Sequence, residues 1–227
     1  MTRVHDMGGR FGNGPVISKP QGIPEFAADW HGRALALTLA SGALGQWNID
    51  TSRHARESLA PKDYTRYSYY EKWIAGLADL LVAKGVLSLE ELAAGQADGA
   101  LAELATRKLK AIDVGATLRK GAPATRNSQV ERLYEVGQSV RTLRPAGNRR
   151  VDGGHTRLPA YAAGAYGRVL RYHGTHVLPD SAAHGLGDAA EPLYAVVFPA
   201  SELWAAAEHP RDEVVLDLWQ SYLKSAP

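Results

Sequence analysis

Residues 69–81 read YYEKWIAGLADLL, and this stretch decides the fold of the first half of the chain. Its apolar side chains recur at intervals of three and four residues, which places them on one face of an α-helix. The pattern ends at Lys84-Gly85, a typical helix terminus. Ser88 comes next, and Glu91 stands three residues after it, as in a capping box. We therefore predict a long amphipathic helix and the start of another after it. The predicted apolar stripe consists of Tyr69, Trp73, Leu77, Leu80 and Leu81.

Two further helices are predicted upstream of this stretch. The first has apolar residues at helical spacing, with Pro24 near its first turn and Gly42 near its end. The second follows Asp50, whose side chain is of a type favoured at helix N-caps, and ends before Pro61. The first 25 residues hold too many glycines and prolines for a helix or a central strand. They predict an extended arm, either disordered or laid against a partner surface.

The hydrophobic period changes to that of strands after Leu133. Short apolar-alternating runs are separated by turn residues, and their number suits a small closed or half-closed barrel better than an open sheet with exposed edges. The predicted fold class is α+β: an arm at 1–25, a helical domain at 26–94, a weakly periodic connector at 95–132 and an SH3-like β-barrel at 133–227. The strand runs are Val136 to Leu143, Tyr166 to Tyr172, Leu193 to Phe198 and Val214 to Trp219.

Composition excludes several function classes. The formal charge of +2 is too small for an electrostatic nucleic-acid or membrane footprint. The sequence has neither an apolar run long enough to span a bilayer nor a signal-peptide core at its start, so we expect a cytoplasmic protein. It has no cysteine, so any thiolate or cysteine-ligated metal has to come from another chain. The common self-contained catalytic signatures are missing, and the histidines show no metal-ligand spacing, so we predict no metal site on this chain.

Three features remain unusual, and each has an ordinary alternative. Arg53 and Glu57 stand four residues apart on a predicted helix and share one face, as a surface ion pair would. Tyr69, Tyr70 and Trp73 form an aromatic cluster, which core packing would also explain. Residues 154–161 form a loop bounded by glycine and proline, which is either structural or a carrier of functional side chains.

In their order and spacing, a series of landmarks resembles the β subunits of nitrile hydratases. The resemblance runs from one end of the chain to the other, except for roughly residues 95–132. The landmarks are Val4-His5-Asp6-Met7-Gly8-Gly9, Phe26 with Trp30, Tyr69-Tyr70-Glu71-Lys72-Trp73, Gly154-His155-Thr156-Arg157, Pro179-Asp180, His184-Gly185-Leu186-Gly187, Glu202-Leu203-Trp204 and Leu216-Asp217-Leu218-Trp219 with Tyr222-Leu223.

This resemblance implies an enzyme that adds water to a nitrile to give the amide. In the family, a Co(III) or Fe(III) ion is bound by the α subunit through cysteine sulfurs and backbone amides, and two of those cysteines are oxidised. A β subunit without cysteine fits that division. The implied partner is an obligate α subunit, with αβ pairs joining into an α2β2 tetramer. Trp219, where iron-type relatives tend to carry Phe, favours the cobalt type.

The resemblance also assigns roles to residues of this chain. The two arginines that hydrogen-bond the oxidised cysteines match Arg53 and Arg157, and the carboxylate and histidine that support them match Glu57 and His155. Ser52 departs from the family, which has Phe there, and could favour bulkier or more polar nitriles. The residues that face the substrate match Ile49, Ser52, Tyr69, Tyr70 and Trp73.

Two other functions stay open from the sequence. An assembly factor that loads metal resembles the N-terminal half of the β subunit but lacks the barrel half, whereas this chain has the Arg157 motif and the Trp219 ending. An SH3-like adaptor or weak RNA binder is the third alternative. The small net charge and the lack of interleaved basic and aromatic residues argue against RNA.

Overall fold

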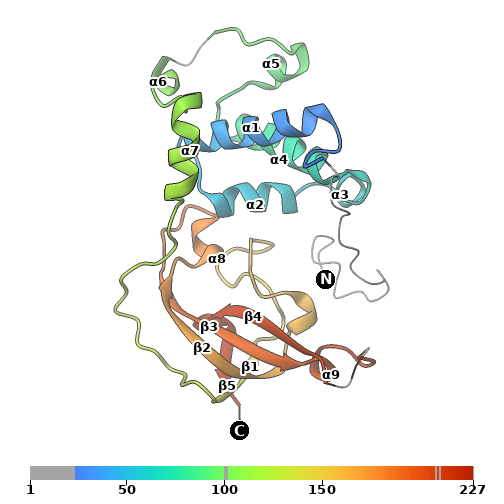
Figure 1. Cartoon of the computed structure of the whole chain (residues 1–227), viewed down its shortest axis with the longest axis vertical. Helices are drawn as coiled ribbons and strands as arrows, with labels where there is room; N and C mark the ends of the chain where they lie inside the picture. Colours follow the sequence, from blue (N-terminus) through green and yellow to red (C-terminus); the bar gives the residue numbers. More distant parts are fainter. Residues whose placement is uncertain (1–23, 100–101, 208, 210, 227) are drawn as a thin grey trace. The chain divides into compact units, whose positions relative to one another are not determined.

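The computed structural model describes residues 24–99, 102–207, 209 and 211–226 (Figure 1). The chain forms two compact units, a helical one that ends at Gly121 and a sheet-containing one that begins at Ala122. The mixed composition of helices and sheet, with a helical N-terminal half, confirms the α+β prediction at that level. The predicted arm falls almost entirely outside the described residues.

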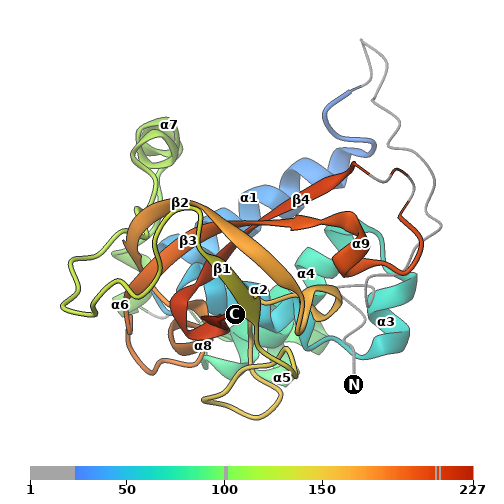
Figure 2. The same cartoon turned by 90° about the horizontal axis from the view of Figure 1, so that it is seen from below.

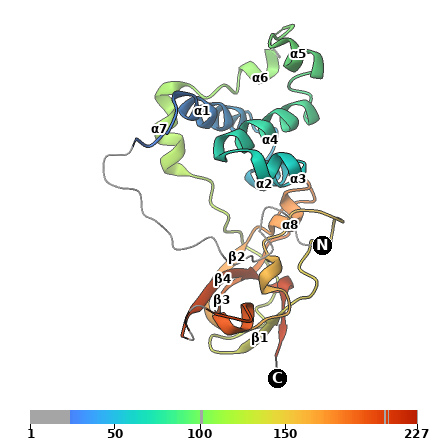
Figure 3. The same cartoon turned by 90° about the vertical axis from the view of Figure 1, so that its right-hand side faces the viewer.

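Helix α4 is the centre of the helical unit, and both α1 and α2 pack against it (Figure 3). It begins after Ser68 with a capping box to Glu71, and a second capping box joins Ser88 to Glu91 at the start of α5, as predicted. Two helices, α6 and α7, lie in the stretch predicted as a connector. The helices are α1 (Asp29–Ala43), α2 (Ile49–Glu57), α3 (Pro61–Arg66), α4 (Tyr69–Ala83), α5 (Leu89–Ala94), α6 (Ala102–Ala105) and α7 (Ala111–Lys120).

The sheet unit contains five antiparallel strands in the order β4-β3-β2-β1-β5. Strands β1 to β4 are labelled in Figure 2 and β5 in Figure 1. Two register shifts in β2, one after Val169 and one after Tyr172, interrupt its pairing with β3. The bounds are β1 (Ser139–Thr142), β2 (Tyr166–His176), β3 (Glu191–Pro199), β4 (Glu213–Trp219) and β5 (Leu223–Ser225), with helix α8 (Pro179–Ala182), helix α9 (Ala200–Leu203) and the short 3₁₀ turns η2 (Ala160–Ala162) and η3 (Gln220–Tyr222).

The structure confirms a small antiparallel sheet but does not confirm that it closes into the predicted SH3-like barrel. In the described part of the chain, edge strands β4 and β5 are not paired with each other, so the sheet is open. The turn η3 separates β4 from β5, and β5 pairs with β1 at the other edge. Closure would need β5 to pair with β4 as well as with β1, and the described strands show only the pairing of β5 with β1.

The core of the sheet unit is built on β3, whose side chains are buried from Pro192 to Phe198. Such continuous burial is typical of a central strand covered on both faces. Leu158, at the end of the irregular stretch 148–158, and Tyr222, in η3, belong to the same core. Their side chains attach these two segments to the sheet. None of the described helices combines the length and the apolar character that a membrane crossing requires.

Candidate active site

Helix α2 carries Arg53 and begins with a side-chain cap. The Asn48 side chain, not the predicted Asp50, is the cap: it accepts a hydrogen bond from the backbone N–H of Thr51 at 2.9 Å. Asp50 lies buried in the first turn, and its carboxylate accepts a hydrogen bond from Arg53 Nη1 at 3.0 Å. The Arg53 side chain is still 41% exposed. A guanidinium has five N–H donors and this bond uses one, so the anchored Arg53 presents a fixed fork of donors.

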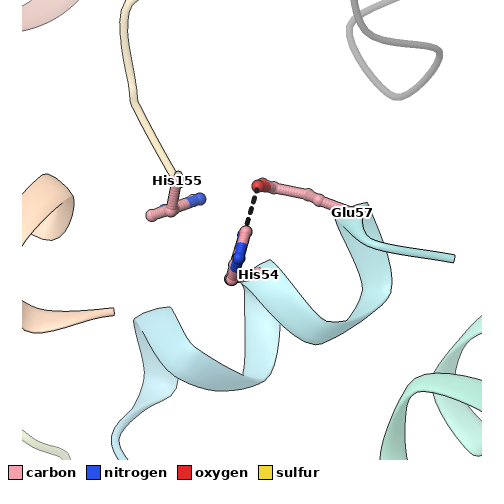
Figure 4. A group of neighbouring side chains, drawn as sticks. All are labelled: His54, Glu57 and His155. Atoms are coloured by element: carbon pink, nitrogen blue, oxygen red, sulfur yellow. Dashed lines mark ion pairs between the residues drawn. The ribbon is translucent and has the colours of Figure 1, made fainter. Parts of the chain in front are cut away.

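Glu57 lies in the last turn of α2, close to His54. Their Oε2 and Nδ1 atoms are 3.9 Å apart (Figure 4). Burial lowers the pKa of Arg56 and raises the pKa of Tyr64, and the negative charge of Glu57 raises the pKa of both. The carboxylate of Glu57 therefore acts electrostatically on a cation and a phenol in its own unit.

Aromatic rings gather at the start of α4. The ring centroid of Tyr69 lies 5.1 Å from that of Tyr70 and 5.5 Å from that of Trp73. Tyr70 also approaches His31 of α1, with 4.7 Å between ring centroids. Tyr70 and Trp73 are half-buried, whereas Tyr69 is 64% exposed. Core packing within the chain accounts in part for Tyr70 and Trp73 but not for Tyr69, so the cluster presents an apolar face with a hydroxyl at its edge.

Helices α2 and α4 approach each other closely at Gly76. A Cβ at this position would lie 2.8 Å from Cγ and 3.2 Å from Cα of Arg56. The guanidinium of Arg56 lies over the Trp73 ring at 4.6 Å from its centroid, and its Nε donates to the Ser52 carbonyl oxygen at 3.1 Å. Glycine thus lets the helix that carries Arg53 lie directly against the helix that carries the aromatic rings.

Ile49 and Ser52, which the resemblance placed at the substrate, lie on the same helix. Ile49 is the first residue of α2 and is 61% exposed, and Ser52 is half-buried. Residues three and four apart are neighbours on a helix surface, so Ile49, Ser52 and Arg53 share one face. The helical unit brings together an exposed apolar side chain, a small polar one and an anchored cation.

His155 and Arg157 lie in segment 148–158, which contains neither helix nor strand. His155 is fully buried; its backbone N–H donates to Nε2 of His184 at 2.9 Å, and its carbonyl accepts from Nδ2 of Asn148 at 2.6 Å. A Cβ at Gly154 would lie 2.7 Å from that His184 nitrogen and 2.8 Å from that Asn148 nitrogen. The backbone of the segment is therefore packed tightly against polar side chains, and glycine is required there.

The backbone of Arg157 rests on two buried residues, Tyr222 and Asp180. The N–H of Arg157 donates to the Tyr222 hydroxyl at 3.1 Å, and that hydroxyl donates to the Asp180 carboxylate. Burial raises the pKa of Asp180 to about 6, against hydrogen bonds with Tyr222 and Thr156 that lower it. Burial also raises the pKa of Tyr222. The phenol therefore keeps its proton near neutral pH, while Arg157 itself is exposed.

The chain matches one known family in two parts that together span nearly all of it. Residues 1–127 match the family described as nitrile hydratase beta subunit, N-terminal, and residues 123–225 match nitrile hydratase beta subunit, C-terminal. The chain belongs to the nitrile hydratase β-subunit family. The prediction made from the landmark residues is confirmed, including for the sheet half, which matches the C-terminal part of the β-subunit family.

Individual members of the β-subunit family are similar in sequence to this chain over nearly their full length. The nitrile hydratase subunit beta of Pseudomonas putida is 36% identical over the whole of both chains. The cobalt-containing nitrile hydratase subunit beta of Pseudonocardia thermophila is 32% identical, over 99% of this chain and 96% of that one. Among solved structures, the recombinant apo-enzyme of thiocyanate hydrolase from Thiobacillus thioparus is similar at 23% identity and a TM-score of 0.37, covering 45% of this chain and 80% of that chain. Family membership rests on the full-length relatives.

The site residues expected of a nitrile hydratase β subunit fall into two sets. Those on α2 and at the start of α4 lie in the helical unit, whereas His155 and Arg157 lie in the sheet unit. Sequence reasoning gave no role to the residues that hold these side chains. Asp180, His184 and Tyr222 belong to the landmarks of the family resemblance, and that resemblance is what marks them in the sequence. The sequence did not single out Asn148, Arg56 or Gly76, because their contacts form only in the folded chain.

Proposed function

We propose that this chain completes the active site of a cobalt nitrile hydratase whose metal is held by a separate α subunit. The observation that carries the proposal is the Arg53 guanidinium, which the buried Asp50 carboxylate anchors at 3.0 Å while 41% of the side chain stays exposed. An arginine fixed in this way is suited to donate to oxygen acceptors on a partner. Membership of the β-subunit family supplies the reaction, the hydration of a nitrile to an amide.

The donor set of this chain fits a metal centre held by a partner. The sequence has no cysteine, so sulfur ligands have to come from the α subunit. The guanidinium groups of Arg53 and Arg157 suit the oxygen atoms of oxidised cysteines, and each charge-assisted hydrogen bond contributes about 1.5–3 kcal/mol. The bound metal supplies Lewis-acid activation of the nitrile or of water. Cobalt is favoured over iron because a full-length relative is named as cobalt-containing and because of Trp219.

The remaining site residues bind and orient the substrate or support the arginines. Ile49 and Tyr69, both exposed, form the apolar side of the nitrile pocket together with Tyr70 and Trp73. The hydroxyl of Tyr69 or of its neighbour Tyr70 donates near the nitrile. Ser52 leaves this side of the pocket wider than the phenylalanine usual in the family. Glu57 and His155 support the arginines from their places on α2 and in segment 148–158, and the carboxylate of Glu57 offsets part of their positive charge.

Assembly and domain organisation follow the same proposal. The arm at 1–25 docks on the α subunit, and αβ pairs join into α2β2. The domains are helical at 26–94, a connector at 95–132 and a sheet domain at 133–227. The strand order, in which the last strand pairs with the first, supports the half-closed form of an SH3-like barrel. A cytoplasmic location stays a prediction.

Co-expression with the α subunit tests the proposal. The measurements are nitrile-to-amide turnover, cobalt per αβ pair and the subunits present after purification, for α alone and for α with this chain. We expect turnover only when this chain remains in the purified complex. Cobalt-loaded, active α subunit that keeps its turnover after this chain is removed would contradict the proposal and favour an assembly factor.

A further inference from the structure

The carboxamide of Asn148 uses all of its hydrogen-bonding positions. Its Oδ1 accepts from the backbone N–H of Arg150 at 2.7 Å and of Val151 at 3.0 Å. Its Nδ2 donates to the carbonyl of His155 at 2.6 Å and to the carbonyl of Asp180 at 2.9 Å. Two N–H groups on one side and two carbonyls on the other fix the orientation of the amide. One side chain therefore joins a turn, the buried histidine and helix α8.

The groups that Asn148 joins lead directly to Arg157. Asp180 gives its backbone carbonyl to Asn148 and its carboxylate to Tyr222, and the Tyr222 hydroxyl in turn accepts from the Arg157 N–H at 3.1 Å. Asn148 and Tyr222 hold the same short stretch at two points, and both are tied to Asp180. A segment without helix or strand depends on such side-chain bonds to satisfy its backbone.

The atoms around these hydrogen bonds are closely packed. At Gly154 a Cβ would lie 2.8 Å from the Asn148 Nδ2 and 2.9 Å from the Val151 Cβ. His155, which follows, is fully buried. Asn148 is thus in contact with the backbone that determines the position of Arg157 on the surface of the sheet unit.

We propose that Asn148 is a positioning residue for nitrile hydration: its carboxamide fixes the backbone from His155 to Arg157 and thereby the direction of the Arg157 guanidinium. The inference rests on the proposed function, in which Arg157 donates to oxygens of the α subunit. Asn148 itself acts only through the segment that it holds.

Asn148→Asp is the sharpest variant because it keeps the shape and the acceptor oxygen while replacing both donors with an oxygen that faces two carbonyls. Asn127→Asp is the matched control, an equal charge change at an exposed position of the same unit. The variants are compared in the assembled complex by kcat, KM and amide hydrogen exchange of residues 154–157. We expect faster exchange and a kcat lower by about 10–100-fold with little change in KM for Asn148→Asp, the size typical of residues that orient a metal site from a distance. The control should change neither.

A second variant separates the positioning role from a loss of folding. Asn148→Ala removes the donors without adding charge, and it is combined with Arg157→Lys. If Asn148 acts through Arg157, Asn148→Ala lowers kcat much less in the Arg157→Lys background than in the wild type. Faster exchange with unchanged kcat, or an equal loss of kcat in both backgrounds, would overturn the positioning role while the function of Arg157 stands. Unchanged kcat in Arg157→Lys alone would instead overturn the proposed role of Arg157, and the inference with it.

Discussion

Replacing Gly76 with alanine tests whether α2 and α4 form one rigid support for Arg53 and the aromatic cluster. The added Cβ would lie 2.8 Å from Cγ, 3.2 Å from Cα and 3.2 Å from the backbone nitrogen of Arg56. Ordinary contacts between carbon atoms are about 3.5–4.0 Å, so the atoms have to separate by several tenths of an ångström. Two of the three contacted atoms are backbone, so a change of side-chain rotamer cannot relieve the contact and α2 itself has to move.

Two opposing effects set the magnitude. Alanine is favoured over glycine inside a helix by about 1 kcal/mol. Overpacking of a close contact costs about 1–3 kcal/mol. Because backbone atoms are involved, we expect overpacking to dominate, with a net loss in the free energy of unfolding of roughly 1–2 kcal/mol.

Urea unfolding of the assembled complex at fixed subunit concentration, followed by circular dichroism, measures this loss. Gly115→Ala is the matched control: Gly115 also lies inside a helix, and its added Cβ would meet only an arginine side chain at 3.8 Å. The control should be as stable as the wild type or more stable by up to about 1 kcal/mol. If Gly76→Ala gains stability as Gly115→Ala does, the close α2–α4 contact is refuted.

Two further substitutions test the sheet unit. Burial raises the pKa of Asp180 from its ordinary 3.8 to about 6. Between these two pH values the native state keeps a proton that the unfolded state has lost. The contribution of Asp180 to stability is therefore lost as the pH rises through about 6. The wild type should therefore lose about 2 kcal/mol relative to Asp180→Asn between pH 4 and pH 7 in urea titrations, and a difference that is constant with pH would contradict this. Gly154→Ala should cost about 1–3 kcal/mol and lower Tm, because its Cβ would lie 2.7 Å from His184 Nε2. Gly147→Ala, which has open space around the new Cβ, should leave Tm unchanged, and equal Tm values for the two variants would argue against the tight packing of segment 148–158.

Local patterns predicted the elements that local forces determine. The stripe on α4 and the capping box at Ser88 depend on spacings of three and four residues, which the sequence displays directly. The cap of α2 was predicted at Asp50, which has a side chain typical of caps, whereas the structure places it at Asn48. The choice depends on the burial of Asp50 and its bond to Arg53, which no local pattern reveals.

Long-range pairing accounts for what the sequence could not predict. The sheet is open because β4 and β5, the strands at its two edges, are not paired with each other in the described part of the chain. At the site, Arg53 and Arg157 were found through the family resemblance, not through periodicity. Asn148 was missed because its hydrogen bonds to His155, seven residues away, and to Asp180, in α8, form only in the folded chain.

The central claim is that two arginines of this chain act at a metal held by the α subunit. The most direct test is nitrile-to-amide turnover of the assembled complex with Arg53→Lys and with Arg157→Lys. Arg66→Lys is the matched control for the first, because Arg66 is also bound to an aspartate three residues earlier, Asp63, at 2.9 Å. Arg150→Lys, at an exposed position of the same segment, is the control for the second. Loss of a charge-assisted hydrogen bond of about 1.5–3 kcal/mol predicts a kcat lower by about 10–150-fold in each site variant, with normal assembly and unchanged controls. Wild-type kcat in both site variants of the assembled complex would contradict the claim.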